Sequence, residues 1–126
     1  MEDPVANIYQ SVASEEPFFR LVDEFYAGVE KDPILRPLYP DDLSHSKQLL
    51  ALFLLQRFGG RTTYSQERGH PRMRARHMPF KIGVAERDAW VKHMGNALDK
   101  VTEFSPFRAA LDFYFQDFAT FMINQP

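Results

Sequence analysis

Hydrophobic residues recur at three- and four-residue spacing along most of this chain, which is the period of an α-helix. The pattern predicts four helices, near residues 18–31, 44–58, 84–101 and 106–123. No segment shows the alternation of hydrophobic and polar residues that is typical of a half-buried strand. The sequence therefore predicts an all-α fold.

Polar, proline and glycine residues mark the ends of these helices. The Ser14 hydroxyl can cap the free amides that open the first helix, and Asp32-Pro33 ends that helix and starts a short helical turn. Gly59-Gly60 ends the second helix. Ser105-Pro106 provides a cap and a proline at the first helical position of the fourth.

The connection between the second and third helices has a different composition. Residues 59–80 read GGRTTYSQERGHPRMRARHMPF, and their glycines and prolines leave room for one or two helical turns at most, around residues 72–77. An irregular connection of about twenty residues is uncommon in a small domain and is more often functional than idle. Its backbone amides and carbonyls also need partners, which a bound ligand would help to organise.

Composition limits the classes of protein to which this chain can belong. A chain of 126 residues with 44% hydrophobic residues is expected to form one domain with a substantial core. The absence of cysteine excludes disulfides, thiolate zinc sites and cysteine nucleophiles. No apolar run is long enough to span a membrane, and the first residues, MEDPVANIYQ, show no signal-peptide pattern, so we expect a cytoplasmic protein.

Charge is distributed unevenly along the chain. The net charge is −2, but residues 59–81 contain five arginines and one lysine against a single acidic residue, Glu67. This segment therefore gives a basic face to an otherwise acidic protein. A nucleic-acid interface is one interpretation of such a face. The acidic remainder would repel a polyanion and no recognition motif is present, so we expect no nucleic-acid partner.

The two histidines of this connection raise further alternatives. His70 and His77 are separated by six residues, outside the usual spacing of zinc ligands, and no cysteine supplements them. His77 can also be a half-buried histidine with no ligand. A haem site is another interpretation, because haem needs an apolar slot, one axial imidazole, and cations or hydroxyls for its propionates. His77 lies between Arg76 and the apolar run 78–80, but composition alone leaves these alternatives open.

Several motifs, in this order along the chain, resemble those of the group II truncated haemoglobins. Residues 64–80, YSQERGHPRMRARHMPF, resemble the proximal segment of that family, and Phe25-Tyr26 and Leu38-Tyr39-Pro40 resemble its distal tyrosine motifs. Gly59-Gly60 resembles the break after the distal helix, and residues 86–90, which end in Trp90, resemble the stretch with the tryptophan that distinguishes the group. The resemblance implies a single truncated globin domain over residues 1–126, folded as a two-over-two α-helical sandwich with a long loop before the proximal histidine.

The resemblance also implies a role for each matched residue. His77 is expected to bind the iron of haem b, and Tyr26, Tyr39 and Trp90 are expected to donate hydrogen bonds to a gas ligand (O2, CO or NO) on the opposite face. The residues expected to line the pocket are Leu50, Phe53 and Leu54, and those expected to contact the propionates are Arg76, Tyr64 and Lys81. Arg68, Arg72 and Arg74 are expected to brace the loop, and His45 and His93 to lie on the surface.

Two departures from the family pattern are mild. Residues 14–17 replace the glycine pair that usually separates the first two helices, which affects the angle of the first helix more than the haem. Phe58 stands where the family usually has tryptophan.

A third departure concerns the distal position of the second helix. The segment after Tyr39 is one residue shorter than usual, so counting back from Gly59-Gly60 selects Ser46, whereas counting forward selects Lys47. We prefer Ser46, because an insertion inside a packed helix would rotate its whole apolar stripe. His45, next to it, is a minor candidate for a sixth iron ligand.

Three functions are compatible with these observations. The leading hypothesis is a haem protein that binds oxygen reversibly. A haem enzyme that converts nitric oxide to nitrate, or that uses peroxide, is the alternative, and a non-haem binding module that uses the basic face is the third. The resemblance allows a reductase partner and a homodimer. The sequence itself specifies neither of them.

Overall fold

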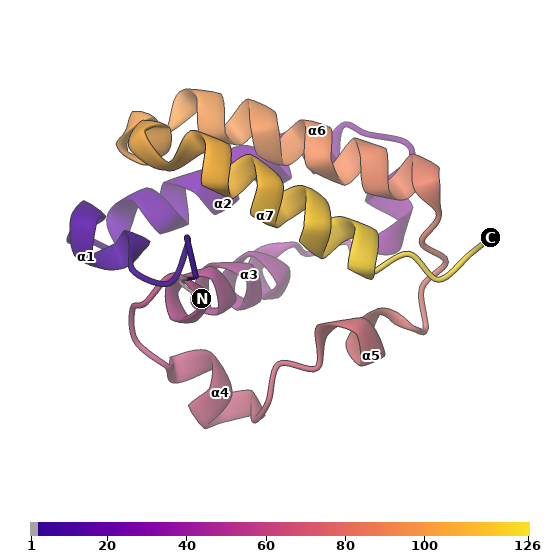
Figure 1. The fold of residues 1–126 in the computed structure, drawn as a ribbon. Coiled ribbons are helices and arrows are strands. Elements are labelled where there is room, and N and C mark those ends of the chain that lie inside the picture. The colour runs from indigo at the N-terminus through magenta and orange to yellow at the C-terminus, as the bar shows by residue number, and fades with distance from the viewer. Residues whose placement is uncertain (1–2) are drawn as a thin grey trace.

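The computed structural model describes residues 3–126, and the elements found in that part of the chain are all helical, which confirms the predicted all-α fold (Figure 1). The α-helices are α1 (Ile8–Val12), α2 (Glu16–Glu30), α3 (Ser44–Arg57), α4 (Thr63–Arg68), α5 (Met73–His77), α6 (Val84–Lys100) and α7 (Arg108–Phe121). Two 3₁₀ turns, η1 (Arg36–Leu38) and η2 (Thr102–Phe107), complete them. The four long helices correspond to the four predicted segments.

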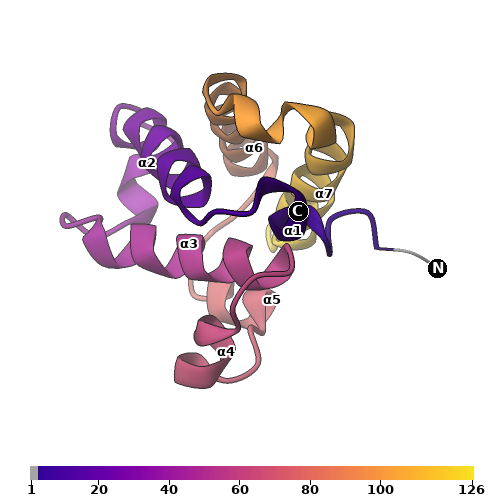
Figure 2. The ribbon, with the colours of Figure 1, turned by 90° about the vertical axis from the view of Figure 1, so that its left-hand side faces the viewer.

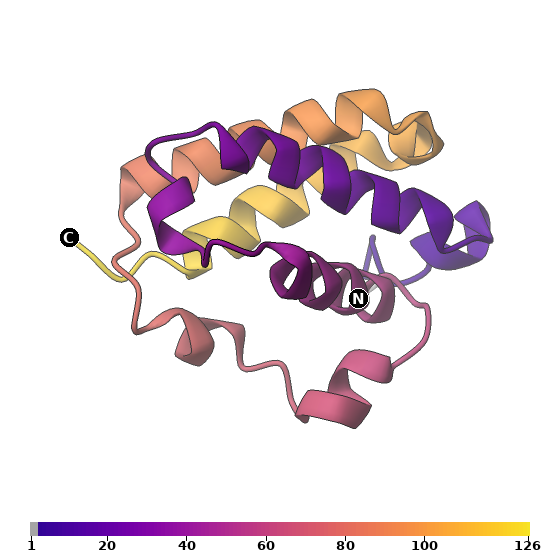
Figure 3. The same ribbon diagram turned by 180° about the vertical axis from the view of Figure 1, so that it is seen from behind.

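The long helices form a two-over-two sandwich. Helix α2 packs against both α6 and α3, and α6 packs against α7. Figure 2 shows α2 and α6 side by side, with α3 and α7 beneath them. The predicted connection, which carries α4 and α5, hangs below α3 and α7 in Figures 1 and 3. No helix among residues 3–126 is long and apolar enough to cross a membrane.

The apolar stripe of α2 forms the centre of the core. Its residues at three- and four-residue spacing, Phe18, Leu21, Phe25 and Val29, are fully buried. The Glu16 amide donates to the Ser14 hydroxyl at 3.3 Å, but Ser14 lies one residue before the N-cap position, which Glu15 occupies without a side-chain cap bond. The α-helical part of the last segment begins later than predicted, at Arg108, because η2 occupies residues 102–107 and includes Pro106. This turn buries Phe104, whose ring meets that of Phe18 edge-on at 5.2 Å.

Two short helices were not predicted from the sequence. Helix α1 is joined to the end of α3 by a hydrogen bond from the Tyr9 amide to the Phe58 carbonyl, at 2.9 Å. Helix α4 is held by Tyr64, which is 3% exposed and packs against Phe53 at a ring distance of 5.7 Å. Both helices depend on tertiary contacts, because isolated helices of five or six residues are unstable in water.

The expectation that His93 lies on the surface is wrong. Its side chain is 13% exposed, and its Nε2 atom lies 2.6 Å from Oδ2 of Asp32, which follows α2. The ring packs against Gly28 of α2, where an added Cβ would overlap Nδ1 of His93. The glycine therefore permits a close approach between α2 and α6, where Gly28 is two residues from Tyr26 and His93 is three residues from Trp90.

Candidate functional site

A cavity of about 300 Å³ brings together side chains from most of the helices. Nine of the eleven residues predicted for the site line it: Tyr26, Tyr39, Ser46, Leu50, Phe53, Tyr64, Arg76, His77 and Trp90. Most of the remaining lining is apolar, from Leu35, Leu38, Leu49, Met73, Phe80, Ile82, Phe118, Ala119 and Met122. The cavity is thus an apolar slot with a small number of polar groups, which is typical of a cofactor site.

His77 enters this cavity as the last residue of α5. The chain turns into α5 at Arg72, which has a left-handed backbone conformation with φ of +46° and whose amide donates to Nδ1 of His70 at 3.1 Å. The Nδ1 atom of His77 lies 2.6 Å from the Met73 carbonyl oxygen. Since a carbonyl can only accept, the proton of the neutral ring resides on Nδ1, and Nε2 is left unprotonated and able to bind a metal.

Three hydrogen-bond donors reach the cavity from other elements. Tyr26 comes from α2, Trp90 from α6, and Tyr39 from the residue after η1. The rings of Tyr26 and Tyr39 are nearly perpendicular, with centroids 5.4 Å apart. In Figures 1 and 3, α2 lies above α3, whereas α5 lies below it.

These donors form a linked network. Burial raises the pKa of Tyr39, while hydrogen bonds with Tyr26 and Trp90 lower it by a smaller amount. The indole N–H of Trp90 can only donate, so Tyr39 accepts from Trp90, and the two phenols are hydrogen-bonding neighbours. Burial, followed by the influence of Tyr39, raises the pKa of Tyr26. Both phenols are therefore neutral donors at physiological pH.

Three arginines, Arg68, Arg76 and Arg87, border the same cavity. Arg76 donates from Nε to the Pro71 carbonyl at 2.7 Å and from Nη2 to the Arg68 carbonyl at 3.0 Å, so it braces the loop while it lines the cavity. Arg68 also lines the cavity, although we expected it only to brace the loop; its guanidinium lies 5.9 Å from the centre of the Tyr64 ring. Each guanidinium has five N–H donors, which leaves some for an anion.

Two predicted residues do not line the cavity. Leu54 is 1% exposed and packs in the hydrophobic core next to Phe53, which does line it. Lys81 is exposed, between Phe80 and Ile82, both of which line the cavity. A one-residue offset along a helix turns a side chain by about 100°, which is why Phe53 and Leu54 face different spaces.

The two ways of counting to the distal position lead to different places. Ser46 lines the cavity, whereas Lys47 lies on another face, with its Nζ atom 3.7 Å from Oδ1 of Asp23. His45 is exposed and is not among the lining residues. The α3 residue at the distal position is therefore the small Ser46, which lines the cavity with Leu49 and Leu50.

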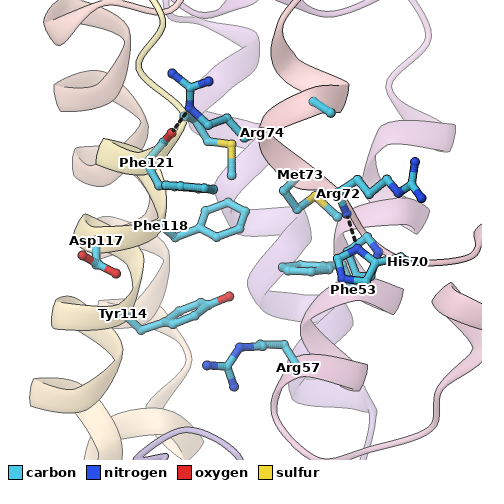
Figure 4. A pocket seen from close by; sticks show the side chains of 13 residues that line it. Phe53, Arg57, His70, Arg72, Met73, Arg74, Tyr114, Asp117, Phe118 and Phe121 are labelled. Atoms are coloured by element: carbon cyan, nitrogen blue, oxygen red, sulfur yellow. Dashed lines mark hydrogen bonds between the residues drawn. The ribbon is translucent and has the colours of Figure 1, made fainter.

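A second cavity, of about 460 Å³, lies next to the first, between α3, α5 and α7 (Figure 4). Phe53, Met73, Phe118 and Met122 line both cavities, so a single layer of side chains separates them. Figure 4 shows Arg74 at one end of this space and Arg57 at the other. The second cavity contains none of the residues Tyr26, His77 and Trp90, all of which line the first.

The donor set of the first cavity fits haem. Among residues 3–126, no group of three or more histidine, aspartate or glutamate side chains is arranged to hold a metal ion. Haem brings its own equatorial nitrogens and needs one axial imidazole, which His77 offers through Nε2. The apolar lining suits the macrocycle, and Arg68, Arg76 and Tyr64 are cations and a hydroxyl that suit propionates.

Comparisons with known proteins identify the family. The family model for bacterial-like globins matches residues 7–124. The chain is 38% identical over 117 residues to the group 2 truncated hemoglobin YjbI of Bacillus subtilis (strain 168), a match that covers 93% of this chain and 88% of the relative. It also matches the crystal structure of a haemoglobin from Chloroflexus aurantiacus, with a TM-score of 0.90, 50% identity, and coverage of 94% of this chain and 98% of the other.

A third match is the X-ray structure of the truncated oxygen-avid haemoglobin from Bacillus subtilis, with a TM-score of 0.88, 37% identity, and coverage of 94% and 99% of the two chains. The chain therefore belongs to the bacterial-like globin family and, within it, to the group II truncated haemoglobins. This family implies a haem-binding protein with diatomic gas ligands.

Proposed function

We propose that this protein is a haem b protein that binds oxygen reversibly. One observation carries the proposal: three neutral donors, Tyr26, Tyr39 and Trp90, share an apolar cavity with a histidine whose Nε2 is free to bind iron. When bound, haem supplies an iron centre that takes O2, CO or NO. The residues of the chain then decide how firmly the cofactor is held and how long a ligand stays.

On the proximal side, the chain holds the cofactor. His77 provides one nitrogen, and the Met73 carbonyl fixes its ring by accepting from Nδ1 at 2.6 Å. Arg76, Arg68 and Tyr64 are positioned to hold the propionates, and Lys81, which is exposed beside Phe80, is a further contact that we predicted from the sequence. Such charge-assisted hydrogen bonds are among the stronger polar contacts in proteins.

On the distal side, the chain holds the ligand. Tyr39 lines the cavity together with Tyr26 and Trp90, which are its hydrogen-bonding neighbours. Fixed donors in a cavity from which water is excluded stabilise a ligand that carries partial negative charge more strongly than they do in water. Slow release of oxygen is therefore expected, and the Bacillus subtilis relative is an oxygen-avid haemoglobin.

The experiment is stopped-flow measurement of oxygen dissociation from the wild-type protein and from single phenylalanine variants of Tyr26 and Tyr39. Loss of one donor is expected to speed dissociation by about tenfold or more, because a buried hydrogen bond of this kind contributes on the order of 1–2 kcal/mol. Unchanged dissociation rates in both variants would contradict the proposal.

The haem enzyme alternative rests on the same donors and has a separate test. Sustained conversion of nitric oxide to nitrate, with a reductase present, would assign turnover to this site, whereas one turnover without renewal would leave oxygen binding as the function. The cytoplasmic location expected from the sequence stays a prediction that cell fractionation would test.

A further inference from the structure

The segment that follows α7 lies against the connection between α5 and α6. Figures 1 and 3 show the chain after α7 next to the strip of chain that leads from α5 into α6. That connection, residues 78–83, immediately follows His77. Pro79 lies within it and has no backbone N–H to donate, and the Phe80 amide donates to the His77 carbonyl at 3.0 Å.

One side chain from the later segment satisfies three backbone groups at once. The Nδ2 atom of Asn124 donates to the His77 carbonyl at 3.3 Å and to the Phe80 carbonyl at 2.8 Å. Its Oδ1 atom accepts from the Ile82 amide at 3.0 Å. An asparagine side chain offers two donors on one nitrogen and an accepting oxygen, and here both ends of the amide are used.

Backbone hydrogen bonds extend the same contact. The Asn124 amide donates to the Ile82 carbonyl at 2.8 Å, and the Gln125 amide donates to the same oxygen at 3.2 Å. Ile82 is 8% exposed and lines the haem cavity, so the contact also holds one of the lining residues in place.

A reciprocal contact runs from α5 to the end of α7. Arg74 donates from Nε to the Phe121 carbonyl at 3.1 Å and from Nη2 to the Ile123 carbonyl at 3.2 Å. These carbonyls belong to the last turn of α7 and the residues after it, where helical partners are missing. The residues on both sides of His77 are thus joined to the same segment, Arg74 before it and Phe80 and Ile82 after it.

From this arrangement we infer that Asn124 is a positioning residue for the proximal histidine. Helix α5 has only five residues and cannot hold its own orientation. The Met73 carbonyl fixes the rotation of the His77 ring, while Asn124 fixes the His77 backbone and the two residues of the following connection that it bonds. The inference rests on the proposed role of His77 as the iron ligand.

The test compares Asn124→Ala with Asn96→Ala in the haem-loaded protein. Asn96 is an exposed residue of α6 and makes a matched control for the same change of side chain. The first measurement is the iron–histidine stretching band in the resonance Raman spectrum of the ferrous protein without gas ligand. The second is the rate at which haem transfers to a haem-free acceptor globin.

Asn124→Ala is expected to shift or broaden the iron–histidine band and to speed haem transfer by about tenfold, since 1.4 kcal/mol of lost interaction corresponds to that factor. Asn96→Ala is expected to match the wild type in both measurements. An iron–histidine band and a transfer rate in Asn124→Ala equal to those of the wild type would overturn the inference.

A second variant separates positioning from simple docking of the segment. Asn124→Asp keeps an acceptor for the Ile82 amide but loses both donors to the His77 and Phe80 carbonyls. It is expected to retain slow hydrogen exchange at the Ile82 amide and still to show the altered iron–histidine band. A wild-type band in this variant would show that the Nδ2 hydrogen bonds do not position His77.

The two proposals fail in distinguishable ways. Failure of the wild-type protein to take up haem would refute the proposed function. Haem uptake by the wild type, with no spectroscopic difference between Asn124→Ala and Asn96→Ala, would refute only the positioning role. Amide exchange at Ile82 in the haem-free protein gives a readout of the Asn124 contact that does not depend on the cofactor, and equal exchange in both variants would count against the inference.

Discussion

Gly28 of α2 contacts His93 of α6. This contact predicts that Gly28→Ala changes the free energy of unfolding in a direction that depends on whether the His93 ring is present. An alanine Cβ at position 28 would overlap Nδ1 of His93 and lie 3.1 Å from its Cγ. The ring cannot move away without disturbing its 2.6 Å bond to Asp32. Gly28→Ala is therefore expected to push apart the two helices that carry Tyr26 and Trp90.

The magnitude follows from two opposing effects. Alanine is favoured over glycine in a helix interior by up to about 1 kcal/mol, and somewhat less near a helix end. Forcing an extra methyl group into a packed contact costs about 1–3 kcal/mol. Because the displaced ring also loses its carboxylate partner, we expect Gly28→Ala to lower the free energy of unfolding by about 1–2 kcal/mol.

Removing the His93 ring reverses the sign of the effect of Gly28→Ala on the free energy of unfolding. In the His93→Ala background the space beside Gly28 is open, so Gly28→Ala is expected to raise the free energy of unfolding by about 0.5–1 kcal/mol through helix propensity alone. The coupling between the two positions is then about 2 kcal/mol, within the range for residues in direct contact. Urea unfolding of all four proteins, followed by far-ultraviolet circular dichroism at one pH and in one haem state, measures it. An equal effect of Gly28→Ala in both backgrounds would refute the packing argument.

Three further predictions concern the site and its pH dependence. His77→Ala should abolish retention of haem through gel filtration, and added imidazole should partly restore the Soret band; undiminished haem content would contradict the assignment. Trp90→Phe removes one donor to Tyr39 and should raise the oxygen dissociation rate by several-fold, because the pocket shape is roughly kept while the N–H is lost; an unchanged rate in stopped-flow measurements would count against the network. The hydrogen bond with His93 holds the pKa of Asp32 below its ordinary value of 3.8. The ionised Asp32 therefore stabilises the fold above pH 3.8, and this stabilisation is lost as the pH falls through the lowered pKa. The difference in unfolding free energy between wild type and Asp32→Asn should be full at pH 7 and shrink below about pH 4, and a difference that stays constant would contradict this prediction.

The parts of the fold that were predictable have a strong local signal. Helix α2 has one apolar stripe with a polar start signal before it, so its position and buried face follow from periodicity. Helix α4 has six residues and gains its stability from Tyr64 and from a pair of hydrogen bonds between Gln56 and Ser65. Such tertiary contacts leave no periodic trace in the sequence.

The limits of the site prediction have similar causes. Every residue from Ala51 to Leu55 is buried in α3, so periodicity could not decide that Phe53 faces the cavity while Leu54 faces the core. The arginines lie on an irregular connection, so their roles depend on the course of the backbone and not on a periodic pattern. Arg68 borders the cavity, whereas Arg74 donates to the Phe121 carbonyl at the end of α7. Asn124 follows the last helix, and nothing in its sequence context marks it as a partner of the proximal segment.

The predictions for the residues with specific chemistry rest on distinctive flanking motifs, and the structure brings three of these residues to one cavity. His77, Tyr26 and Trp90 come from three different helices, yet each lies in a short motif that resembles one family. The structure adds what motifs cannot give: the Met73 carbonyl that selects the tautomer of His77, and the perpendicular packing of the Tyr26 and Tyr39 rings. Both depend on side-chain orientations that sequence does not encode.

The central claim is that His77 holds haem while the opposite face stays open to gas ligands. The most direct measurement is the absorption spectrum of the purified, hemin-reconstituted protein in the ferric state, after reduction, and after addition of carbon monoxide. We expect a Soret band that shifts on reduction to a five-coordinate ferrous form and shifts again with carbon monoxide. A six-coordinate ferrous spectrum before any gas is added, or no Soret band at all, would contradict it.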